Sequence, residues 1–375
     1  MSNNSCFGSA FTKYSNTVAG HNDLLSNEEG DFLVKPTNPT EILFYEQSCK
    51  NPDFCDFLPT FYGTLQLQNN TSCEASSLPQ VQHICFENIV STYKNPSIID
   101  IKIGTRLYDD DASQEKIKKM QIKAKQTTSS TLGVRICGLR VYKNTTSLQN
   151  NLLSDLSCNS DSVDSLQSSL LIQNSCIQDI TCIPITRQSD YCRKLNNSTL
   201  ADELDFFFSN ISDTPLFKAY RSYLLDSIVD ELQNFLELIN TLEFRLYSSS
   251  LLIVYESDIN TIIDLNSKMN FFQIDLLQKP TDHNIKLLDT NFKGYLDSDK
   301  YDGCGFNTNT GTHHNDSDSA SDISDYGSTN DIAHTELYDF RAIDFAHSKW
   351  TPGIGPDEQY IFGIKNLIDI LLKLK

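Results

Sequence analysis

The sequence predicts an α+β fold, with room for one large two-lobed unit or for two ordinary domains. Two observations lead to this class. The chain has 375 residues, 39% of them hydrophobic, with 21 Phe and 16 Tyr, so it can bury a sizeable core. Short apolar runs typical of strands also alternate along the chain with longer segments of helical periodicity.

The predicted strands are short apolar runs that end at turn residues. The segment 31–35 is one such strand, and Pro36 and Pro39 break it. In 98–103 apolar and polar positions alternate, and this strand ends at Gly104. The remaining strands are expected at 61–67, 83–90, 134–141, 245–256 and 341–345.

The predicted helices begin at polar residues and continue with apolar residues on one side. Glu41 opens the first of them, and Ser113 is the expected N-cap of a helix over 113–126. The other helices are expected at 199–209, 215–240 and 366–375.

Three segments have compositions that do not favour a packed core. Residues 1–17 lie in a polar stretch rich in Ser and Asn and are expected to be flexible. Residues 144–178 are rich in Ser, Asn, Asp, Gln and Leu and are expected to be a variable insertion. Residues 298–333 are acidic, have no hydrophobic period and are expected to be disordered.

The charge of the chain is unevenly distributed. The net charge of −19 argues against direct, non-specific nucleic-acid binding. Residues 102–143 nevertheless contain ten Lys or Arg against four Asp or Glu, whereas residues 302–339 contain eight acidic residues and no basic one. A basic island within an acidic chain predicts that a small anionic ligand binds at one place.

The cysteines indicate a reducing compartment. There are 11 of them, an odd number, and no two have a CxxC spacing. Cys85 and Cys137 lie among apolar residues, so buried free thiols are expected rather than disulfides or a zinc site. No secretory signal is visible, and no apolar run approaches the roughly 18 residues that a membrane span needs. We expect a soluble intracellular protein without a membrane span.

The first motif with chemical potential is the segment 96–104, with the sequence PSIIDIKIG. Asp100 and Lys102 are two residues apart on a predicted strand, so their side chains point to the same side. The carboxylate is suited to ribose hydroxyls and the ammonium to a phosphate, and Gly104 lets the backbone turn close to a ligand. The alternative is an ion pair on an exposed strand.

The second motif is a row of lysines on the predicted helix 113–126. Lys116, Lys119 and Lys123 recur at i, i+3 and i+7 and form one charged stripe. Like charges at these spacings mildly destabilise a helix, which an anionic ligand would offset. The alternative is an ordinary solvated helix face.

The third motif is the sequence IDFAH at 343–347. Asp344 follows an apolar strand, where its carboxylate can hold the Mg²⁺ that bridges ATP phosphates, although an aspartate there can also simply cap a turn. His347 is a candidate contact to substrate, or a residue that fixes the loop.

Two further segments contribute candidate nucleotide contacts. The tetrad SSLL occurs at 168–171 and again at 249–252, but only the later copy continues into a strand-like run, so Ser250 is the candidate. Lys35 at a strand end and Glu41 at a helix start resemble the Lys–Glu pair that positions ATP phosphates in protein-kinase-like folds. The alternative for that pair is a surface ion pair.

Glu87 and the residues up to Val90 fall where a hinge between two lobes would bind adenine, mainly through backbone groups. The chain has no G-x-G-x-x-G loop, no H-R-D motif and no G-x-x-x-x-G-K-[S/T] sequence. Protein kinases and P-loop folds are therefore not favoured.

Taken together in their order along the chain, these motifs resemble the inositol polyphosphate kinase family. The sequence P-x-x-x-D-x-K-x-G is the signature of that family, I-D-F-A-H is similar to its metal-binding motif, and the helix after the signature is similar to its inositol-phosphate-binding helix. The resemblance implies a two-lobed protein-kinase-like fold with ATP in the interlobe cleft. It implies an ATP-binding N-lobe over 18–90 and a C-lobe over 91–375.

The resemblance also implies roles for the candidate residues. Lys35, Glu41, Glu87, Asp100 and Ser250 would bind the nucleotide. Lys102 and Asp344 would be catalytic, with Asp344 as the ligand of Mg²⁺ or Mn²⁺. The substrate phosphates would be bound by Lys102, Lys116, Lys119, Lys123 and His347.

The acidic segment before I-D-F-A-H is similar to insertions in the fungal multikinases of that family. This implies phosphorylation of soluble inositol tris- and tetrakisphosphate to tetrakis- and pentakisphosphate, in a monomer located in nucleus and cytoplasm. One alternative is an inositol hexakisphosphate kinase. Another is a scaffold in transcription regulation, with transcription factors as partners of the acidic segment. No general base is evident from the sequence.

Overall fold

Two five-stranded antiparallel sheets organise the protein. The computed structural model describes residues 11–19, 23–66, 81–144, 182–209, 215–273 and 336–375. All of these residues belong to one compact unit of the chain.

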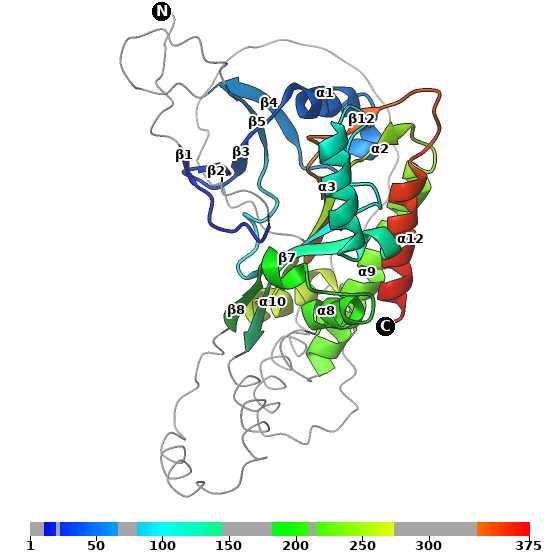
Figure 1. Ribbon diagram of the computed structural model, residues 1–375. Helices are drawn as coiled ribbons and strands as arrows, with labels where there is room; N and C mark the ends of the chain where they lie inside the picture. Colours follow the sequence, from blue (N-terminus) through cyan, green and yellow to red (C-terminus); the bar gives the residue numbers. More distant parts are fainter. Residues whose placement is uncertain (1–10, 20–22, 67–80, 145–181, 210–214, 274–335) are drawn as a thin grey trace, which may run out of the picture. The chain divides into compact units, whose positions relative to one another are not determined.

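The first sheet has the strand order β1-β2-β3-β5-β4 and is shown in blue in Figure 1. Its strands are β1 (Phe11–Lys13), β2 (Leu25–Asn27), β3 (Phe32–Pro36), β4 (Phe61–Gln66) and β5 (Gln82–Glu87). Helix α1 (Pro39–Ser48) follows β3 and is capped by Asn38, whose side chain accepts a hydrogen bond from the Glu41 backbone N–H. This cap fixes the position of Glu41 relative to the end of β3.

The second sheet has the order β11-β10-β6-β7-β8. Its strands are β6 (Pro96–Ile103), β7 (Val134–Asn144), β8 (Cys182–Arg187), β10 (Ser250–Glu256) and β11 (Tyr338–Ile343). Strand β6 is central, and every residue in it except Lys102 is buried. The alternation predicted from the sequence therefore does not mark an exposed face, because this strand is covered on both sides.

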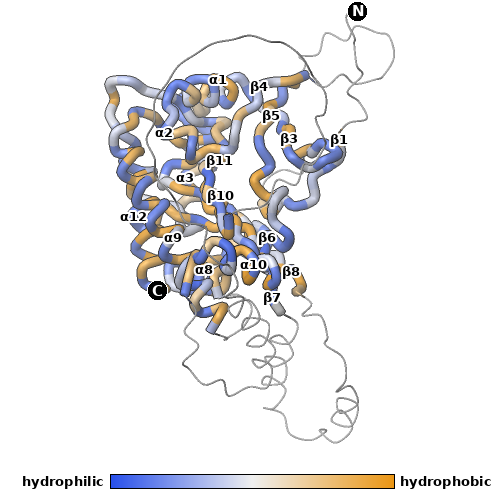
Figure 2. The backbone as a smooth tube through the Cα atoms, turned by 180° about the vertical axis from the view of Figure 1, so that it is seen from behind, coloured by the Kyte–Doolittle hydropathy of each residue, from blue (hydrophilic) through white to orange (hydrophobic). Residues whose placement is uncertain are grey.

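Helices surround the second sheet. The longest are α9 (Pro215–Ile239) and α12 (Glu358–Leu372), which pack against each other. Along both helices hydrophobic and hydrophilic stretches alternate in Figure 2, as expected for helices with one buried face. The others are α2 (Pro52–Cys55), α3 (Gln114–Lys125), α4 (Ser129–Leu132), α7 (Ser189–Cys192), α8 (Thr199–Phe208) and α10 (Ile259–Met269).

Most of the predicted elements are confirmed, including the helix after Gly104, which has Ser113 as its N-cap. Two predictions differ. The segment 245–256 divides into β9 (Phe244–Arg245), which pairs with β12 (Lys349–Trp350), and β10. The closing helix begins at Glu358 rather than 366, because Asp357 caps it. Strand β8 and helix α10 were not predicted.

Several predictions concern residues outside those that the structure describes. These are the insertion over 144–178, apart from its first residue, and the acidic segment 298–333. The segment 1–17 was predicted to be flexible, but its residues 11–13 form strand β1, which pairs with β2 in the first sheet. Cys85 and Cys137 are buried free thiols, as predicted. No helix of the described part is long and apolar enough to cross a membrane.

Candidate active site

A cavity of about 750 Å³ lies between residues of both sheets and helix α3. Leu33 and Lys35 of the first sheet, Asp100 and Lys102 of the second, and Lys116 of α3 all contribute to its lining. Residues predicted separately from five sequence motifs therefore meet around one space.

One end of the cavity contains a network of three charged side chains. The Lys35 ammonium lies 3.0 Å from Glu41 Oε1 and 2.8 Å from Asp344 Oδ1. Glu41 is 1% exposed and also accepts hydrogen bonds from Thr37 Oγ1 and the Phe345 backbone N–H, at 2.6 and 3.1 Å. Glu41 thus connects the end of β3 with the loop after β11.

These contacts shift the pKa values of both partners. Burial by itself lowers the pKa of Lys35, but the carboxylates of Asp344 and Glu41 outweigh it and raise this pKa above its ordinary value. Enclosure in the cavity by itself raises the pKa of Asp344, but Lys35 and Lys102 outweigh it and hold this pKa well below its usual range. Asp344 is therefore a carboxylate at neutral pH.

The backbone holds Asp344 in an uncommon conformation. Its φ angle is +65°, in the left-handed region, although it is not a glycine. The next residue, Phe345, is fully buried and its ring stacks on Phe44 with centroids 4.6 Å apart. Tertiary packing therefore holds a strained residue at the strand end, as is common at functional sites.

Asp344 fits a divalent cation of the kind that accompanies a nucleotide. Its side chain is 38% exposed. Among the described residues there is no group of three or more His, Cys, Asp or Glu that would enclose a metal ion by itself. Mg²⁺ in phosphate-transfer sites is usually bound through one or two carboxylates together with waters and substrate phosphates. The donor set at Asp344 matches that mode.

Lys102 lies next to this network. Its ammonium donates hydrogen bonds to the Ser248 carbonyl oxygen at 2.6 Å and to Ser250 Oγ at 3.1 Å, and it is 3.7 Å from Asp344 Oδ2. Ser250 is fully buried, and Ser248, not Ser250, lines the cavity. The predicted contact of Ser250 with the nucleotide thus has no support in this geometry, because the hydroxyl lies against Lys102 and supports its position.

Asp100 lines the same cavity, and only 7% of its surface is exposed. Burial raises the pKa of its carboxyl, while Lys102 opposes the change. Its Oδ1 atom is buried and has no hydrogen-bond partner among the described residues. Such an atom calls for a ligand or a water, which agrees with the prediction that Asp100 faces a ligand hydroxyl. Gly104, by contrast, turns against α12 rather than toward the cavity, with φ of +95°.

Helix α3 brings two of its three candidate lysines to the cavity. Lys116 and Lys123 line it together with Met120, whereas Lys119 is exposed and does not. Residues 116, 120 and 123 follow the i, i+4, i+7 spacing of one helix face, and residue 119 lies to the side of it. The predicted substrate contact at Lys119 has no support in this geometry.

The sequence reasoning missed an acidic partner of the substrate-side residues. Asp109 Oδ2 lies 2.7 Å from His347 Nδ1 and 3.4 Å from the Lys116 ammonium. The next residue, Asp110, contacts the Lys349 ammonium at 2.8 Å, and this contact holds the pKa of Asp110 at about 2, below its ordinary value. The run of three aspartates at 109–111 was the available signal.

The apolar part of the cavity is lined by Leu33, Ile84, Val90 and Leu252. Glu87 also borders it, but its carboxylate accepts hydrogen bonds from Thr60, at 3.1 Å from the backbone N–H and 2.9 Å from Oγ1. The Glu87 side chain is thus engaged elsewhere, and the backbone N–H groups of Glu87 and Asn88 already donate to the carbonyl oxygens of Thr60 and Asp31.

Residues 14–19 complete this side and were also missed. Tyr14 donates a hydrogen bond to Asn88 Oδ1 at 3.2 Å, and Val18 is buried beside Ile89 and Val90. The segment comes so close to β7 that a Cβ on Gly138 would lie 1.9 Å from the Val18 carbonyl oxygen. Gly138 is the signal in the sequence, because only glycine permits this approach.

Comparison with known proteins gives matches over most of the chain. The family model described as inositol polyphosphate kinase matches residues 83–372. The inositol polyphosphate multikinase of Saccharomyces cerevisiae is 27% identical over 393 residues, covering 95% of this chain and 96% of that protein. The multikinase of Schizosaccharomyces pombe is 26% identical, covering 69% of this chain and 85% of that protein.

The matches also include a hexakisphosphate kinase and a solved crystal structure. Human inositol hexakisphosphate kinase 1 is 26% identical over 78% of this chain, which spans only 52% of that protein. The crystal structure of the S. cerevisiae inositol phosphate multikinase in complex with ADP and Mn²⁺ superposes with a TM-score of 0.55 and 26% identity. It covers 92% of this chain and 99% of that one. The predicted fold is thereby confirmed, and since the family model spans more than three quarters of the sequence, the chain belongs to the inositol polyphosphate kinase family.

Proposed function

We propose that the protein is an ATP-dependent inositol polyphosphate multikinase. It transfers phosphoryl groups to inositol tris- and tetrakisphosphate and yields tetrakis- and pentakisphosphate. The likeness to the S. cerevisiae multikinase over 95% of this chain supports this range, as do the ADP and Mn²⁺ in that relative's structure. The human hexakisphosphate kinase matches a smaller share of both chains.

One observation carries the proposal. A single cavity contains Lys35, Asp344 and Lys102 in mutual contact at one end and the lysines of α3 along another wall. The first group suits nucleotide phosphates with a divalent cation, and the second suits the phosphates of an acceptor molecule. An acceptor hydroxyl between them would lie close to the phosphoryl group that moves.

The residues of the chain would act mainly by binding and orienting. Lys35 and Lys102 neutralise phosphate oxygens, and Asp344 holds the divalent cation, which supplies further neutralisation of charge on the transferred phosphoryl group. Glu41 keeps the Lys35 ammonium in place, and the Ser248 carbonyl does the same for Lys102. These fixed cations need little reorganisation when charge develops.

The reaction is an in-line transfer. The acceptor hydroxyl oxygen forms a bond to the γ-phosphorus, and the bond from that phosphorus to the β–γ bridging oxygen breaks. ADP leaves with that oxygen, and the hydroxyl proton passes to solvent. The transition state of such transfers is loose, so positioning and charge neutralisation contribute more than a strong base.

The test is product analysis with the full chain. Wild type and Asp344→Ala are incubated with ATP, Mg²⁺ and either inositol trisphosphate, tetrakisphosphate or hexakisphosphate, and products are separated by anion-exchange chromatography. We expect wild type to yield tetrakis- and pentakisphosphate, and Asp344→Ala to yield neither.

Pyrophosphate products from the hexakisphosphate alone would assign the chain to the alternative activity. No product from any of the three substrates would overturn the proposal. A further arm with phosphatidylinositol bisphosphate in vesicles shows whether lipid-borne acceptors are also used.

A further inference from the structure

The arginine at position 135 is a buried cation that the sequence motifs did not single out. Arg135 is the second residue of β7 and only 5% exposed. Among the residues that the structure describes, its guanidinium has no hydrogen-bond acceptor and no carboxylate within ion-pair distance, and its Nε is fully buried. An unpaired charge in such a place is costly unless a partner arrives from outside the chain.

Two other arginines of the protein, each with a side chain 25% exposed, show what a paired one looks like. Arg221 and Arg341 also have an Nε without a partner. Their terminal nitrogens, however, lie 2.5 Å from Asp205 and 2.9 Å from Asp339. Arg135 therefore differs from arginines whose role is structural.

The register of the second sheet places Arg135 beside the catalytic residues. Ile343 pairs with Ser250, Ser250 with Lys102, and Lys102 with Arg135, so one row crosses four strands. Directly paired residues share a face of the sheet, and adjacent strands lie about 5 Å apart. Arg135 thus lies one strand beyond Lys102, on the side away from Asp344.

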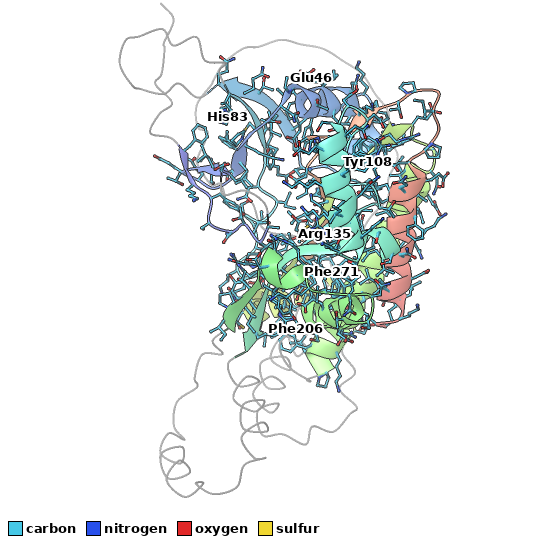
Figure 3. All side chains as sticks on the ribbon, viewed as in Figure 1. Glu46, His83, Tyr108, Arg135, Phe206 and Phe271 are labelled. Atoms are coloured by element: carbon cyan, nitrogen blue, oxygen red, sulfur yellow. The ribbon has the colours of Figure 1, made fainter. Side chains whose placement is uncertain are left out.

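Lys123 of α3 is the neighbouring cation. Figure 3 labels Arg135 where β7 passes the C-terminal end of α3, the end that carries Lys123. The pKa of Lys123 is lowered by burial and, next, by the charge of Arg135. Among the described residues the Lys123 ammonium also has no ion-pair or hydrogen-bond partner, although it lines the cavity.

The cations that line the cavity, together with Arg135, which lies beyond its lining, fall into two groups. Lys35, Lys102 and Lys116 each face a carboxylate of the chain within 4 Å. Lys123 and Arg135 have none in the described part, and they lie together. These two cations without an ion-pair partner define a place that suits an anionic group, although the charge of Arg135 also opposes the rise in the pKa of Asp100, whose carboxylate is thus nearby.

We propose that Arg135 and Lys123 form one phosphate subsite for the acceptor substrate, with Arg135 as its floor. This deepens the proposed function and rests on it, since it concerns which chain atoms bind the acceptor. The guanidinium offers a rigid fork that fits two phosphate oxygens, and Lys123 adds a mobile ammonium from the opposite wall. Arg135 would bind the acceptor and not ATP, because it is separated from Asp344 by two strands.

The test compares Arg135→Met with wild type and with Arg221→Met, which removes an arginine of α9 that is paired with Asp205 and does not line the cavity. For Arg135→Met we expect the KM for inositol trisphosphate to rise about tenfold or more, as for the loss of a hydrogen bond to a charged group. The KM for ATP and the properties of Arg221→Met as an enzyme should not change.

Thermal unfolding distinguishes an arginine that binds the ligand from one that only stabilises the fold. Removal of an unpaired buried cation should leave the Tm of Arg135→Met unchanged or raise it. Inositol trisphosphate added without ATP should raise the Tm of wild type and raise that of Arg135→Met much less. Arg135→Lys, which retains the charge, should recover part of this response.

Equal stabilisation of wild type, Arg135→Met and Arg135→Lys by the trisphosphate would overturn the subsite. A lower Tm of Arg135→Met with both KM values raised would show a structural arginine and would also overturn it. Neither result affects the proposed function, which fails only if wild type phosphorylates no inositol polyphosphate.

Discussion

The two groups of cations at the cavity differ in whether they have carboxylate partners. At the Lys35 end, the ammonium lies between Glu41 and Asp344, and Lys102 adds a second cation to the same carboxylate. Lys123, which lines the cavity, and Arg135, which lies beyond the lining, have no carboxylate of the described residues within ion-pair distance, although the charge of Arg135 is near enough to oppose the rise in the pKa of Asp100. The first group is preorganised by the chain itself, whereas the second is completed only by a ligand. Substitutions in the first group should therefore affect both stability and catalysis, and those in the second should affect substrate binding alone.

The strongest way to break this contrast is Lys35→Met. Asp344 and the nearly fully buried Glu41 would then be two carboxylates without the ammonium between them. We expect kcat/KM for ATP to fall by about a hundredfold or more and the free energy of unfolding to fall by about 2 kcal/mol, the cost of an uncompensated charge, reduced by partial exposure. Steady-state kinetics and urea unfolding measure the two effects. Unchanged stability together with lost activity would show that the pair does not organise this end.

The pH dependence at this end follows from the shifted pKa values. The pKa of Asp344 is lowered in the folded state, so its contribution to stability is present above the unfolded pKa and is lost as pH falls through the folded one. The pKa of Lys35 is raised, so its contribution is lost only as pH rises through a value above 10.5. The pair itself should therefore give no change in stability between these limits.

The second prediction sharpens the contrast along one helix. Lys123→Met removes a cation that lines the cavity, and Lys119→Met removes an exposed one on the same helix. We expect the KM for inositol trisphosphate to rise about tenfold in Lys123→Met, as for the loss of a hydrogen bond to a charged group. Lys119→Met serves as the control and should match wild type in kinetics and in Tm. Equal effects of the two substitutions would mean that the total charge of α3 affects binding of the trisphosphate, and the position of each lysine does not.

A third prediction concerns the close approach of residues 14–19 to the second sheet. A methyl group in Gly138→Ala would lie 1.9 Å from the Val18 carbonyl oxygen, so the segment must move. Because this segment borders the apolar part of the cavity, we expect a higher KM for ATP, an unchanged KM for inositol trisphosphate and a loss of about 1–3 kcal/mol in stability. The reverse pattern of KM changes would place the nucleotide at the other end of the cavity.

The last prediction concerns Lys143, a second buried cation on β7. Its ammonium donates hydrogen bonds to the carbonyl oxygens of Phe206 and Ser209, at 3.2 and 3.1 Å. Burial lowers its pKa to about 8, Asp205 opposes this and Arg187 adds to it. Between pH 8 and the ordinary value of 10.5, the unfolded chain therefore binds more protons than the folded one.

The free energy of unfolding should then rise with pH in this interval, by at most about 3 kcal/mol. Lys143→Met should abolish the rise, which urea unfolding at a series of pH values measures. A rise that persists in Lys143→Met would assign it to another group. Lys143 also shows how the chain accommodates a buried cation that needs no ligand, in contrast to Arg135.

The strands and helices with strong patterns could be predicted from the sequence. Of the two SSLL segments, the one that was predicted to enter a strand does so. The copy at 249–252 begins strand β10, whereas the copy at 168–171 lies outside the described residues. The expectations of transcription-factor partners, of a nuclear and cytoplasmic location and of a monomer stay predictions. So does the scaffold role of the segment 298–333, which Asp344→Ala would separate from catalysis.

The site residues that the sequence missed have a common cause. Arg135 and Asp109 each come from a segment whose local pattern is ordinary, and their surroundings are set by residues from other elements. Lys119 does not line the cavity, and helical spacing alone does not show which side of a charged stripe faces a cavity.

By itself, the sequence determined which chemical groups the protein has and which of them stand close together on one strand or one helix. Asp100 with Lys102, and Lys116 with Lys123, follow from local geometry alone, because strands and helices have fixed periods. Only the tertiary structure decided that Lys35 meets Asp344, 309 residues away, and that Arg135 lacks a partner. Whether a charged side chain has a counter-ion depends on the three-dimensional arrangement of the residues and not on their order along the chain. A charge with a counter-ion is neutralised within the protein, whereas a charge without one is available to bind a ligand.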